Sequence, residues 1–305
     1  MNLLIVLTLL LATALGPLGQ GFGVIANKLS QITPAQAKSH SVAMRPNALM
    51  PKPTIKPNMK PLAISAQAGM IMDPATSEVI VKKSSNERLA PASLTKLMTA
   101  LVIMDRHKPD EIVEVENQFS STQADAQKVG LKVGQKFRLS DLMQMLLVYS
   151  ANDAAEALAV YDAGSVEAFV NRMNEYSAKL GLDDSHFENP TGLDATNHYS
   201  SAADLVSMAR ILLHNQSFRT IVRQPRGVVQ SLGGTNFSFA STNQLLAYPY
   251  IIGLKTGKTE QAGECLVTLS TKDGHELITV VLNSPNRFQE SKNMVDWAFA
   301  NTIWK

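Results

Sequence analysis

The sequence predicts an α+β fold in which strands from both ends of the globular region form one sheet around a helical middle. Short alternating apolar runs follow Ala63, helical periodicity fills the middle third, and β-rich runs after Arg226 lead into a last helix. With 305 residues and 45% hydrophobic content, the chain can bury a sizeable core. Strands at both ends favour a sheet that holds both ends, with the helical part as an insertion.

The first expected elements are a hairpin and a helix. Residues 63–72 and 79–81 are apolar or alternating, and 73–77 (Asp-Pro-Ala-Thr-Ser) joins them with the composition of a turn. Apolar residues over 94–104 then recur with the i, i+3, i+4, i+7 spacing of one helix face. Pro91 suits the start of that helix.

The middle third is expected to be almost entirely helical. Three helix ends carry sequence signals: Ser140-Asp141 resembles an N-cap, Gly181 is typical of a helix stop, and Ser201-Ala-Ala-Asp204 resembles a capping box. The expected elements are short strands around 112–113 and 137, and helices over 142–148, 152–161, 166–180 and 205–214.

The β-rich sequence after Arg226 predicts the rest of the sheet. Gly233-Gly234 and the turn Lys272-Asp273-Gly274 divide it into separate strands. The expected strands cover 227–232, 263–271 and 276–282, and a closing helix covers 287–304.

The amino terminus is typical of an exported protein. Leu3 to Leu15 is apolar apart from Thr8 and Thr13, close to the h-region of a signal peptide, although no basic residue precedes it. Cleavage at 35–37 (Ala-Gln-Ala) and retention as an uncleaved anchor both fit the pattern. We expect residues 1–26 to direct export to the periplasm or the extracytoplasmic cell envelope, and any membrane association to come from this segment alone.

Residues 27–61 are predicted to form a linker. They contain six prolines, six basic residues and no acidic residue, which is typical of an extended spacer. This composition fits a solvated spacer or a basic tether attracted to anionic envelope polymers. The globular domain is expected to cover 62–305.

The composition argues against several function classes. A formal net charge of +2 without a long block of like charges gives no indication of nucleic-acid binding. Cys265 is the single cysteine, so no intramolecular disulfide can form, and its apolar neighbours favour a buried structural thiol. The six histidines form no metal-binding pair such as HxxH or HExxH, so no metal or other cofactor is expected.

Ser93 and Lys96 form the one Ser-x-x-Lys motif of the chain, at the start of the helix expected over 94–104. Residues three apart on a helix lie one above the other, so the Lys96 amine would lie against the Ser93 hydroxyl and accept its proton. Taken alone, such a serine is more often an ordinary residue at a helix start. The motif therefore needs partners elsewhere in the chain.

Two further motifs supply these partners. Ser150-x-Asn152 lies between two expected helices, and Lys255-Thr256-Gly257, the one Lys-Thr-Gly of the chain, enters the β-rich section. Alone, Asn152 would be a helix cap and Lys255 a solvated lysine at a strand end. In this order, the three motifs are the signature of penicillin-recognising serine enzymes.

The residues around these motifs resemble the low-molecular-mass D-alanyl-D-alanine carboxypeptidases, penicillin-binding proteins that trim or cleave peptidoglycan stem peptides. The similar stretches are 91–96, 150–155, Phe187-x-Asn189-Pro190-x-Gly192-Leu193-Asp194, and 253–257 with Ala262-Gly263. The resemblance covers about 62–305. It implies a β-lactamase/transpeptidase-like fold, with a five-stranded antiparallel sheet covered by helices beside an all-helical subdomain, and without the C-terminal β domain of some relatives.

The resemblance implies three catalytic residues. Ser93 would attack the carbonyl between two D-alanines of a peptidoglycan pentapeptide and form an acyl-enzyme, with Lys96 as base and Ser150 as proton relay to the leaving amine. A free lysine has a pKa of about 10.4, so the pKa of Lys96 must fall by roughly 3 for work near pH 7. Burial and the neighbouring Lys255 cation would both favour this.

The resemblance also implies a set of substrate-binding residues. One group would hold the substrate amide and terminal carboxylate, namely Asn152, Lys255 and Thr256. Gly257 would leave room for the peptide beside the strand. The backbone N–H groups of Ser93 and Lys258 would form the oxyanion hole.

Two positions depart from several relatives. Lys258 follows Lys-Thr-Gly where those relatives carry His, and Thr242 stands before Asn243 where they carry Arg. Both would lie near the terminal carboxylate of the substrate, so the preference between carboxypeptidase and endopeptidase substrates stays open. Asp153, Asn189 and Asp194 are expected to be structural, since turns favour these residue types.

Three other activities are compatible with the same motifs. The first is a D,D-endopeptidase on peptidoglycan crosslinks. The second is a serine β-lactamase, but no glutamate between the last two motifs has the Leu-Asn context of a deacylating base in one class, so slow deacylation and inhibition by β-lactams are expected. The third, a non-enzymatic penicillin sensor, needs transmembrane and cytoplasmic partner domains, whereas this chain has one short apolar run.

Overall fold

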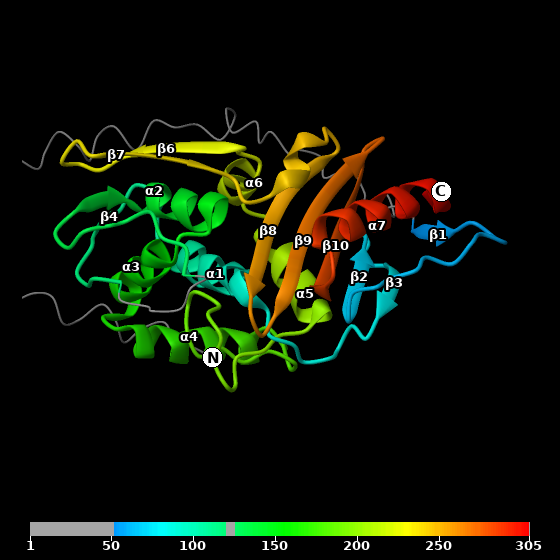
Figure 1. Cartoon of the computed structure of the whole chain (residues 1–305), viewed down its shortest axis with the longest axis horizontal. Helices are drawn as coiled ribbons and strands as arrows, with labels where there is room; N and C mark the ends of the chain where they lie inside the picture. The colour runs from blue at the N-terminus through cyan, green and yellow to red at the C-terminus, as the bar shows by residue number, and fades with distance from the viewer. Residues whose placement is uncertain (1–51, 120–125, 305) are drawn as a thin grey trace, which may run out of the picture. The chain divides into compact units, whose positions relative to one another are not determined.

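The central element of the structure is a five-stranded antiparallel sheet with the strand order β3-β2-β10-β9-β8 (Figure 1). The structure, a computed structural model, describes residues 52–119 and 126–304. The strands of the sheet are β2 (Ala68–Met72), β3 (Val79–Lys83), β8 (Ile251–Thr259), β9 (Gly263–Lys272) and β10 (His275–Ser284). The α+β class and the five-stranded sheet are therefore confirmed, as is the hairpin β2–β3.

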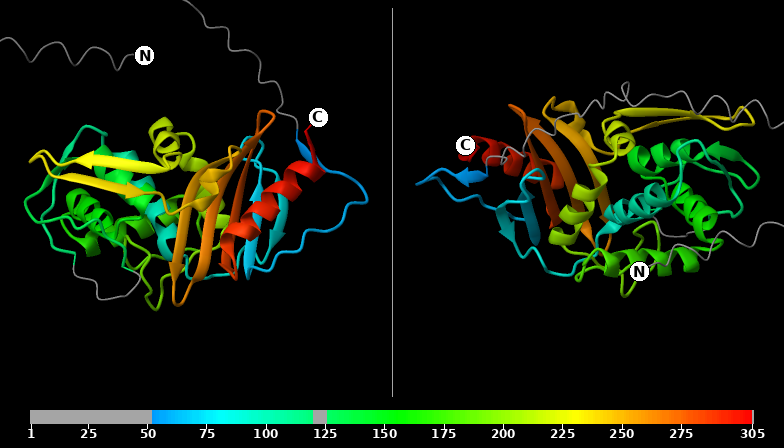
Figure 2. Two further views of the ribbon diagram at one scale, coloured as in Figure 1. Left: turned by 45° about the horizontal axis from the view of Figure 1, so that its top comes forward. Right: turned by 180° about the vertical axis from the view of Figure 1, so that it is seen from behind.

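Helices cover both faces of this sheet. α7 (Arg287–Asn301) packs on one face and α5 (Ala202–Leu212) on the other (Figures 1 and 2). Successive residues of a strand point to opposite faces, so a strand covered on both sides contributes residues to two cores. In β9, Leu266 belongs to the apolar cluster beneath α7, while the next residue, Val267, belongs to the larger core on the other side.

The remaining helices form a helical region next to β8 (Figure 1). α1 packs against α3, α4 and α5, and so connects this region to the sheet. The helices are α1 (Lys96–Arg106), α2 (Leu139–Gln144), α3 (Asn152–Ala163), α4 (Val166–Lys179) and α6 (Gln216–Val222). Two small antiparallel sheets accompany them: β4 (Ile112–Glu114) with β5 (Lys136–Arg138), and β6 (Arg226–Gln230) with β7 (Asn236–Ala240).

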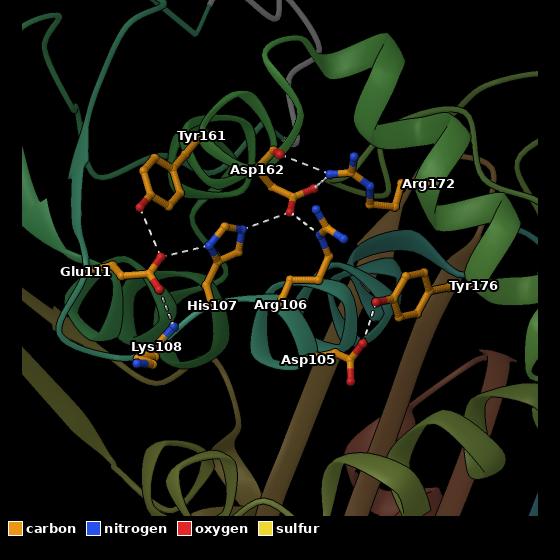
Figure 3. A network of polar contacts seen from close by, with 9 residues as sticks. All are labelled: Asp105, Arg106, His107, Lys108, Glu111, Tyr161, Asp162, Arg172 and Tyr176. Atoms are coloured by element: carbon orange, nitrogen blue, oxygen red, sulfur yellow. Dashed lines mark hydrogen bonds and ion pairs between the residues drawn. The ribbon is translucent and has the colours of Figure 1, made fainter. Parts of the chain in front are cut away.

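A buried carboxylate connects three of these helices. The Asp162 side chain is fully buried near the end of α3, and it accepts hydrogen bonds from Arg106 Nε at 2.7 Å, His107 Nε2 at 2.8 Å and Arg172 on α4 (Figure 3). Burial would raise the pKa of Asp162, but the hydrogen bonds from these three side chains outweigh it, and the pKa is lowered. The charged carboxylate therefore holds α3 against α4 and the end of α1.

Of the three predicted helix-end signals, one is confirmed and one is confirmed in part. Gly181 follows α4 in the left-handed region, with φ +66°. Ser201 caps α5 by accepting a hydrogen bond from the Asp204 backbone N–H at 3.1 Å, but the Asp204 carboxylate accepts from Asp184 N and Ser185 Oγ and does not complete a capping box. The cap predicted at Ser140-Asp141 is wrong, because α2 begins one residue earlier without a side-chain cap. The N–H groups of Leu139 and Ser140 instead donate to backbone carbonyls of residues 111 and 109.

The later elements differ from the predictions at their boundaries. The predicted strands after Arg226 are confirmed, but β7, β8 and α6 were not among the predicted elements. The closing helix ends at Asn301, and the last three described residues form the strand β11 (Thr302–Trp304). Within the described residues, no helix combines the length and the apolar character that a membrane span requires.

The predicted linker is wrong in its last part. Residues 1–51, which include the predicted export segment, lie outside the described residues. Pro53–Ile55 form β1, which pairs antiparallel with β11, and the Trp297 indole N–H donates to the Lys60 carbonyl at 3.0 Å. Proline is tolerated here because β1 and β11 form a two-stranded edge. The domain therefore begins before residue 62.

Deleting residues 1–61 should destabilise the domain relative to deleting residues 1–51. The longer deletion removes β1 and the carbonyl partner of Trp297. We expect a loss of about 1–2 kcal/mol, which lowers the Tm by roughly 2–8 °C in a domain of this size. Scanning calorimetry of the two truncated proteins measures the difference, and equal Tm values would show that 52–61 is a spacer after all.

Candidate active site

Ser93 lies in a tight turn that leads into α1. A 3₁₀ turn over Ala92–Thr95 precedes the helix, and Ala92 takes the left-handed backbone conformation, with φ 50°. This conformation is costly for a residue other than glycine and persists only where the surroundings impose it. The turn leaves Ser93 partly exposed between buried neighbours.

The predicted contact between Ser93 and Lys96 is present. The Lys96 side chain is fully buried, and its Nζ lies 2.9 Å from Ser93 Oγ, 2.6 Å from Asn152 Oδ1 and 2.6 Å from the Thr191 carbonyl oxygen. Burial lowers the pKa of Lys96 well below its ordinary value, and the charge of Lys255 acts in the same direction. A lowered pKa favours the neutral amine, which is the form that can accept a proton.

The second motif lies at the junction of two helices. α2 continues into a π-helical turn over Met145–Tyr149, which ends at Ser150 in the left-handed conformation, with φ 71°. Ser150 Oγ accepts a hydrogen bond from Lys255 Nζ at 2.8 Å. Asn152 opens α3, and its backbone N–H donates to the Gln127 carbonyl at 2.7 Å. The irregular turn is what brings the Ser150 hydroxyl to β8.

Asp153 has a structural role, as predicted. Its carboxylate accepts hydrogen bonds from the backbone N–H groups of Val129, Gly130 and Leu131, at 2.8–3.2 Å. Because these bonds satisfy the carboxylate, it holds the 129–131 loop against α3 beside Asn152.

Lys255 on β8 is a buried residue and not a solvated lysine at a strand end. Its side chain is 1% exposed, and Nζ donates to Ser150 Oγ and to the Thr256 carbonyl, both at 2.8 Å. Burial, followed by the charge of Arg287, lowers the pKa of Lys255 to about 7. The Arg287 guanidinium donates to the Gly257 carbonyl at 2.5 Å. Lys255 is therefore near its titration midpoint at neutral pH.

Gly257 is required by the close approach of β8 to the Ser93 turn. A Cβ atom there would lie 3.0 Å from Ala92 Cβ and from the Pro91 carbonyl oxygen, and 3.1 Å from Ser93 N. The sequence suggested that glycine leaves room for a peptide. The structure adds a nearer reason, because the turn that carries Ser93 occupies that space.

The two positions that depart from several relatives differ in their surroundings. Thr242 Oγ1 lies 2.5 Å from Thr256 Oγ1, so it contacts the third motif directly. The Lys258 side chain is exposed, and its amine lies 3.4 Å from Glu264 on β9. The oxyanion hole formed by the backbone N–H groups of Ser93 and Lys258 stays a prediction.

Two parts of the site were not predicted from sequence. The Thr191 carbonyl contacts Lys96, and Arg287 influences Lys255 from α7. The first is a backbone group, which leaves no residue-type signal, although its Phe-x-Asn-Pro-x-Gly surroundings were noted. The second lies 30 residues beyond Gly257 and belongs to no motif.

The structure also describes the residues considered for other chemistry. Cys265 is buried, as predicted, and burial raises the pKa of its thiol to about 11. Among residues 52–119 and 126–304, no group of three or more His, Cys, Asp and Glu side chains is placed to hold a metal ion.

Replacing Arg287 with Met should raise the pKa of Lys255, because a like charge that disfavours the ammonium is removed. Arg287→Lys keeps the charge and should leave the pKa near 7. The pH dependence of the Lys255 ¹³Cε shift measures both. An unchanged pKa in Arg287→Met would contradict the assigned cause.

The same shift predicts how stability depends on pH. The unfolded chain holds the Lys255 proton up to about pH 10.4, whereas the folded chain releases it near 7, so the unfolded state binds more protons in between. The contribution of Lys255 to the free energy of unfolding therefore rises with pH across this window.

Comparison with known proteins gives the following similarities. The sequence model of a family described as D-alanyl-D-alanine carboxypeptidase matches residues 55–286. D-alanyl-D-alanine carboxypeptidase DacF of Bacillus subtilis (strain 168) is 34% identical over 246 residues, which are 78% of this chain and 63% of that protein. The chain thus spans less than two thirds of the length of DacF, as it does for DacC of Escherichia coli and DacD of Salmonella typhimurium.

Two solved structures have the same fold at moderate sequence identity. The crystal structure of the Streptomyces K15 DD-transpeptidase superposes with a TM-score of 0.72 at 28% identity, covering 79% of this chain and 100% of that one. Penicillin binding protein 6B from Escherichia coli superposes with a TM-score of 0.72 at 32% identity, covering 80% of each chain. The expected transpeptidase-like fold is therefore confirmed.

Proposed function

Since the chain belongs to the D-alanyl-D-alanine carboxypeptidase family, we propose that it is a serine-type D-alanyl-D-alanine carboxypeptidase acting on peptidoglycan stem peptides. The observation that carries the proposal is the buried Lys96 amine, 2.9 Å from Ser93 Oγ and with a lowered pKa. Ser93 Oγ attacks the carbonyl carbon between the two D-alanines and the C–N bond breaks. The terminal D-alanine leaves, and water then hydrolyses the acyl-enzyme and restores the Ser93 hydroxyl.

The hydrogen bonds of the site suggest a route for the proton. Lys96 takes the proton of the Ser93 hydroxyl during attack. Ser150 Oγ accepts from Lys255 Nζ, so its own hydroxyl hydrogen is available for the leaving nitrogen. In the proposed mechanism Ser150 passes this proton on and takes another from Lys255. When water hydrolyses the acyl-enzyme, Lys96 returns its proton to Ser93 Oγ and the attacking water gives a proton back to Lys255.

Substrate binding uses the groups that these contacts leave available. Asn152 Oδ1 is occupied by Lys96, so its amide N–H groups can donate to a carbonyl of the substrate. Lys255, Thr256 and Thr242 lie together and hold the terminal carboxylate. The backbone N–H groups of Ser93 and Lys258 complete the site as an oxyanion hole, in which each donor is commonly worth about 3 kcal/mol of barrier.

One observation supports D,D-endopeptidase activity on crosslinks as a second candidate. The Thr242 and Thr256 hydroxyls, 2.5 Å apart, are neutral. A pair of hydroxyls can hydrogen-bond an amide that continues into a second peptide as well as a terminal carboxylate.

The substrate class also bears on location. Peptidoglycan is assembled outside the cytoplasm, and the apolar run from Leu3 to Leu15 is typical of an export segment. We therefore propose that the enzyme acts in the extracytoplasmic cell envelope.

A labelled penicillin should form a stable adduct on the Ser93 peptide of the full chain, because Ser93 is acylated and deacylation is slow. Mass mapping detects the adduct, and Ser93→Ala and Lys96→Ala should abolish it while circular dichroism shows a native fold. Free D-alanine released from a pentapeptide, compared with cleavage of a crosslinked dimer, distinguishes the two candidate activities. Rapid turnover of the drug, or no label on Ser93, would refute the proposal.

Gly257→Ala should slow acylation of Ser93 by roughly 10-fold, because the new methyl lies within 3.0–3.1 Å of the Ser93 turn and pushes it out of place. Catalysis depends steeply on the position of the reacting group. Stopped-flow measurement of penicillin acylation gives the rate. Gly233→Ala is the matched control, since a Cβ at residue 233 meets only Ser231 Oγ at 3.9 Å. Equal rates for both variants would show that the close approach has no catalytic consequence.

A further inference from the structure

The Lys96 amine has more oxygen neighbours than a neutral amine has hydrogens. Two of the three, Asn152 Oδ1 and the Thr191 carbonyl, are carbonyl oxygens that can only accept, both at 2.6 Å. The third, the Ser93 hydroxyl, can also donate. The two N–H groups of the neutral amine therefore go to the carbonyl oxygens, and its lone pair is left for the hydrogen of the Ser93 hydroxyl.

The direction of the Thr191 carbonyl is set by Asn189. Asn189 Oδ1 accepts hydrogen bonds from Thr191 N at 3.1 Å, Thr191 Oγ1 at 2.8 Å and Gly192 N at 2.7 Å. The Thr191 C=O and the Gly192 N–H belong to one planar trans peptide unit and point in opposite directions. When Asn189 holds that N–H on one side, the carbonyl is directed to the other side, where Lys96 lies.

The turn that carries this peptide packs directly against the Ser93 turn. Gly192 has φ +82°, and a Cβ there would lie 1.9 Å from the Ala92 carbonyl oxygen, so only glycine fits. From α1, Thr99 Oγ1 donates to the Pro190 carbonyl at 2.7 Å. The Asn189 side chain also donates to the Leu193 carbonyl at 2.9 Å, so the turn is fixed on several sides.

We propose that Asn189 is a positioning residue for the acylation step: through the peptide between Thr191 and Gly192 it directs the Thr191 carbonyl at Lys96, so that the lone pair of the amine faces Ser93. This inference rests on the proposed function, in which Lys96 takes the proton of Ser93. Asn189 lies outside the three motifs, and the sequence alone predicted only a structural role for it. Asn189 itself does not touch the amine, and acts through the backbone.

The test is the pH dependence of Ser93 acylation by a penicillin in the full chain. In Asn189→Ala the pH-independent rate should fall by about 10-fold or more, because the amine is no longer oriented. In the profile of acylation rate against pH, the rate rises as Lys96 loses its proton, and the apparent pKa of this rise should not increase. The amine stays buried and has lost an acceptor that favours the ammonium. Asn189→Asp keeps the accepting oxygen that holds the Gly192 N–H, although it loses the hydrogen bond to the Leu193 carbonyl. It should restore most of the maximal rate, while its negative charge raises the pKa of Lys96 in the pH profile.

Asn174→Ala is the matched control. Asn174 exchanges hydrogen bonds with the Phe187 backbone, at 2.8 and 2.9 Å, at the start of the same stretch. This variant should lose thermal stability as Asn189→Ala does, but keep the maximal acylation rate.

Two results would overturn the inference. If Asn189 only stabilised the fold, water would reach Lys96 in the alanine variant, and the pKa of Lys96 in the pH profile would rise toward that of free lysine with an unchanged maximal rate. Failure of Asn189→Asp to restore the rate is the second. Absence of acylation in the unmodified protein would instead refute the proposed function, so the two failures are distinguishable.

Discussion

The rest of the site depends on an amine buried without a partner carboxylate among the described residues. Burying an ammonium costs free energy, so the neutral form of Lys96 is favoured. A neutral amine can also be buried without a large cost only when its hydrogens find acceptors. Asp153 is the acidic side chain that raises the pKa of Lys96, yet that carboxylate is satisfied by the backbone of the 129–131 loop. The acceptors come instead from neutral groups on α3 and on the turn that follows Asn189, and this requires α1, α3 and that turn to meet at one point.

After burial, the charge of a second lysine also lowers the pKa of Lys96. Lys255 adds a like charge near Lys96, and Arg287 does the same for Lys255, so the three cations form a series in which each lowers the pKa of the next. The two buried lysines can then take different tasks. In the proposed mechanism Lys96 accepts a proton, while Lys255 carries charge toward the substrate and donates to Ser150.

Sequence patterns predicted those parts of the fold and site that rest on local periodicity and side-chain identity. Apolar spacing predicted the helices around Ser93 and Asn152 and the strands β2, β3, β9 and β10. The strand β1 was missed, since Pro53 and the prolines on either side of the strand are typical of a spacer, and only its pairing with β11 makes it a strand. The Thr191 carbonyl was missed for a related reason, because a backbone oxygen is placed by the fold and has no residue type of its own.

The same contacts limit how this site can recognise a terminal carboxylate. The Lys258 amine lies beside Glu264, and the Arg287 guanidinium is engaged with the Gly257 carbonyl. The Thr242 hydroxyl meets that of Thr256, and neither is charged. Of the groups proposed to contact the carboxylate, only Lys255 carries charge, and its pKa is about 7. In the proposed mechanism, Lys255 loses its charge as pH rises through 7, so the preference for a free terminal carboxylate over an extended peptide weakens. Lys96 stays neutral over this range, so Ser93 can still be acylated by substrates that are held through uncharged contacts.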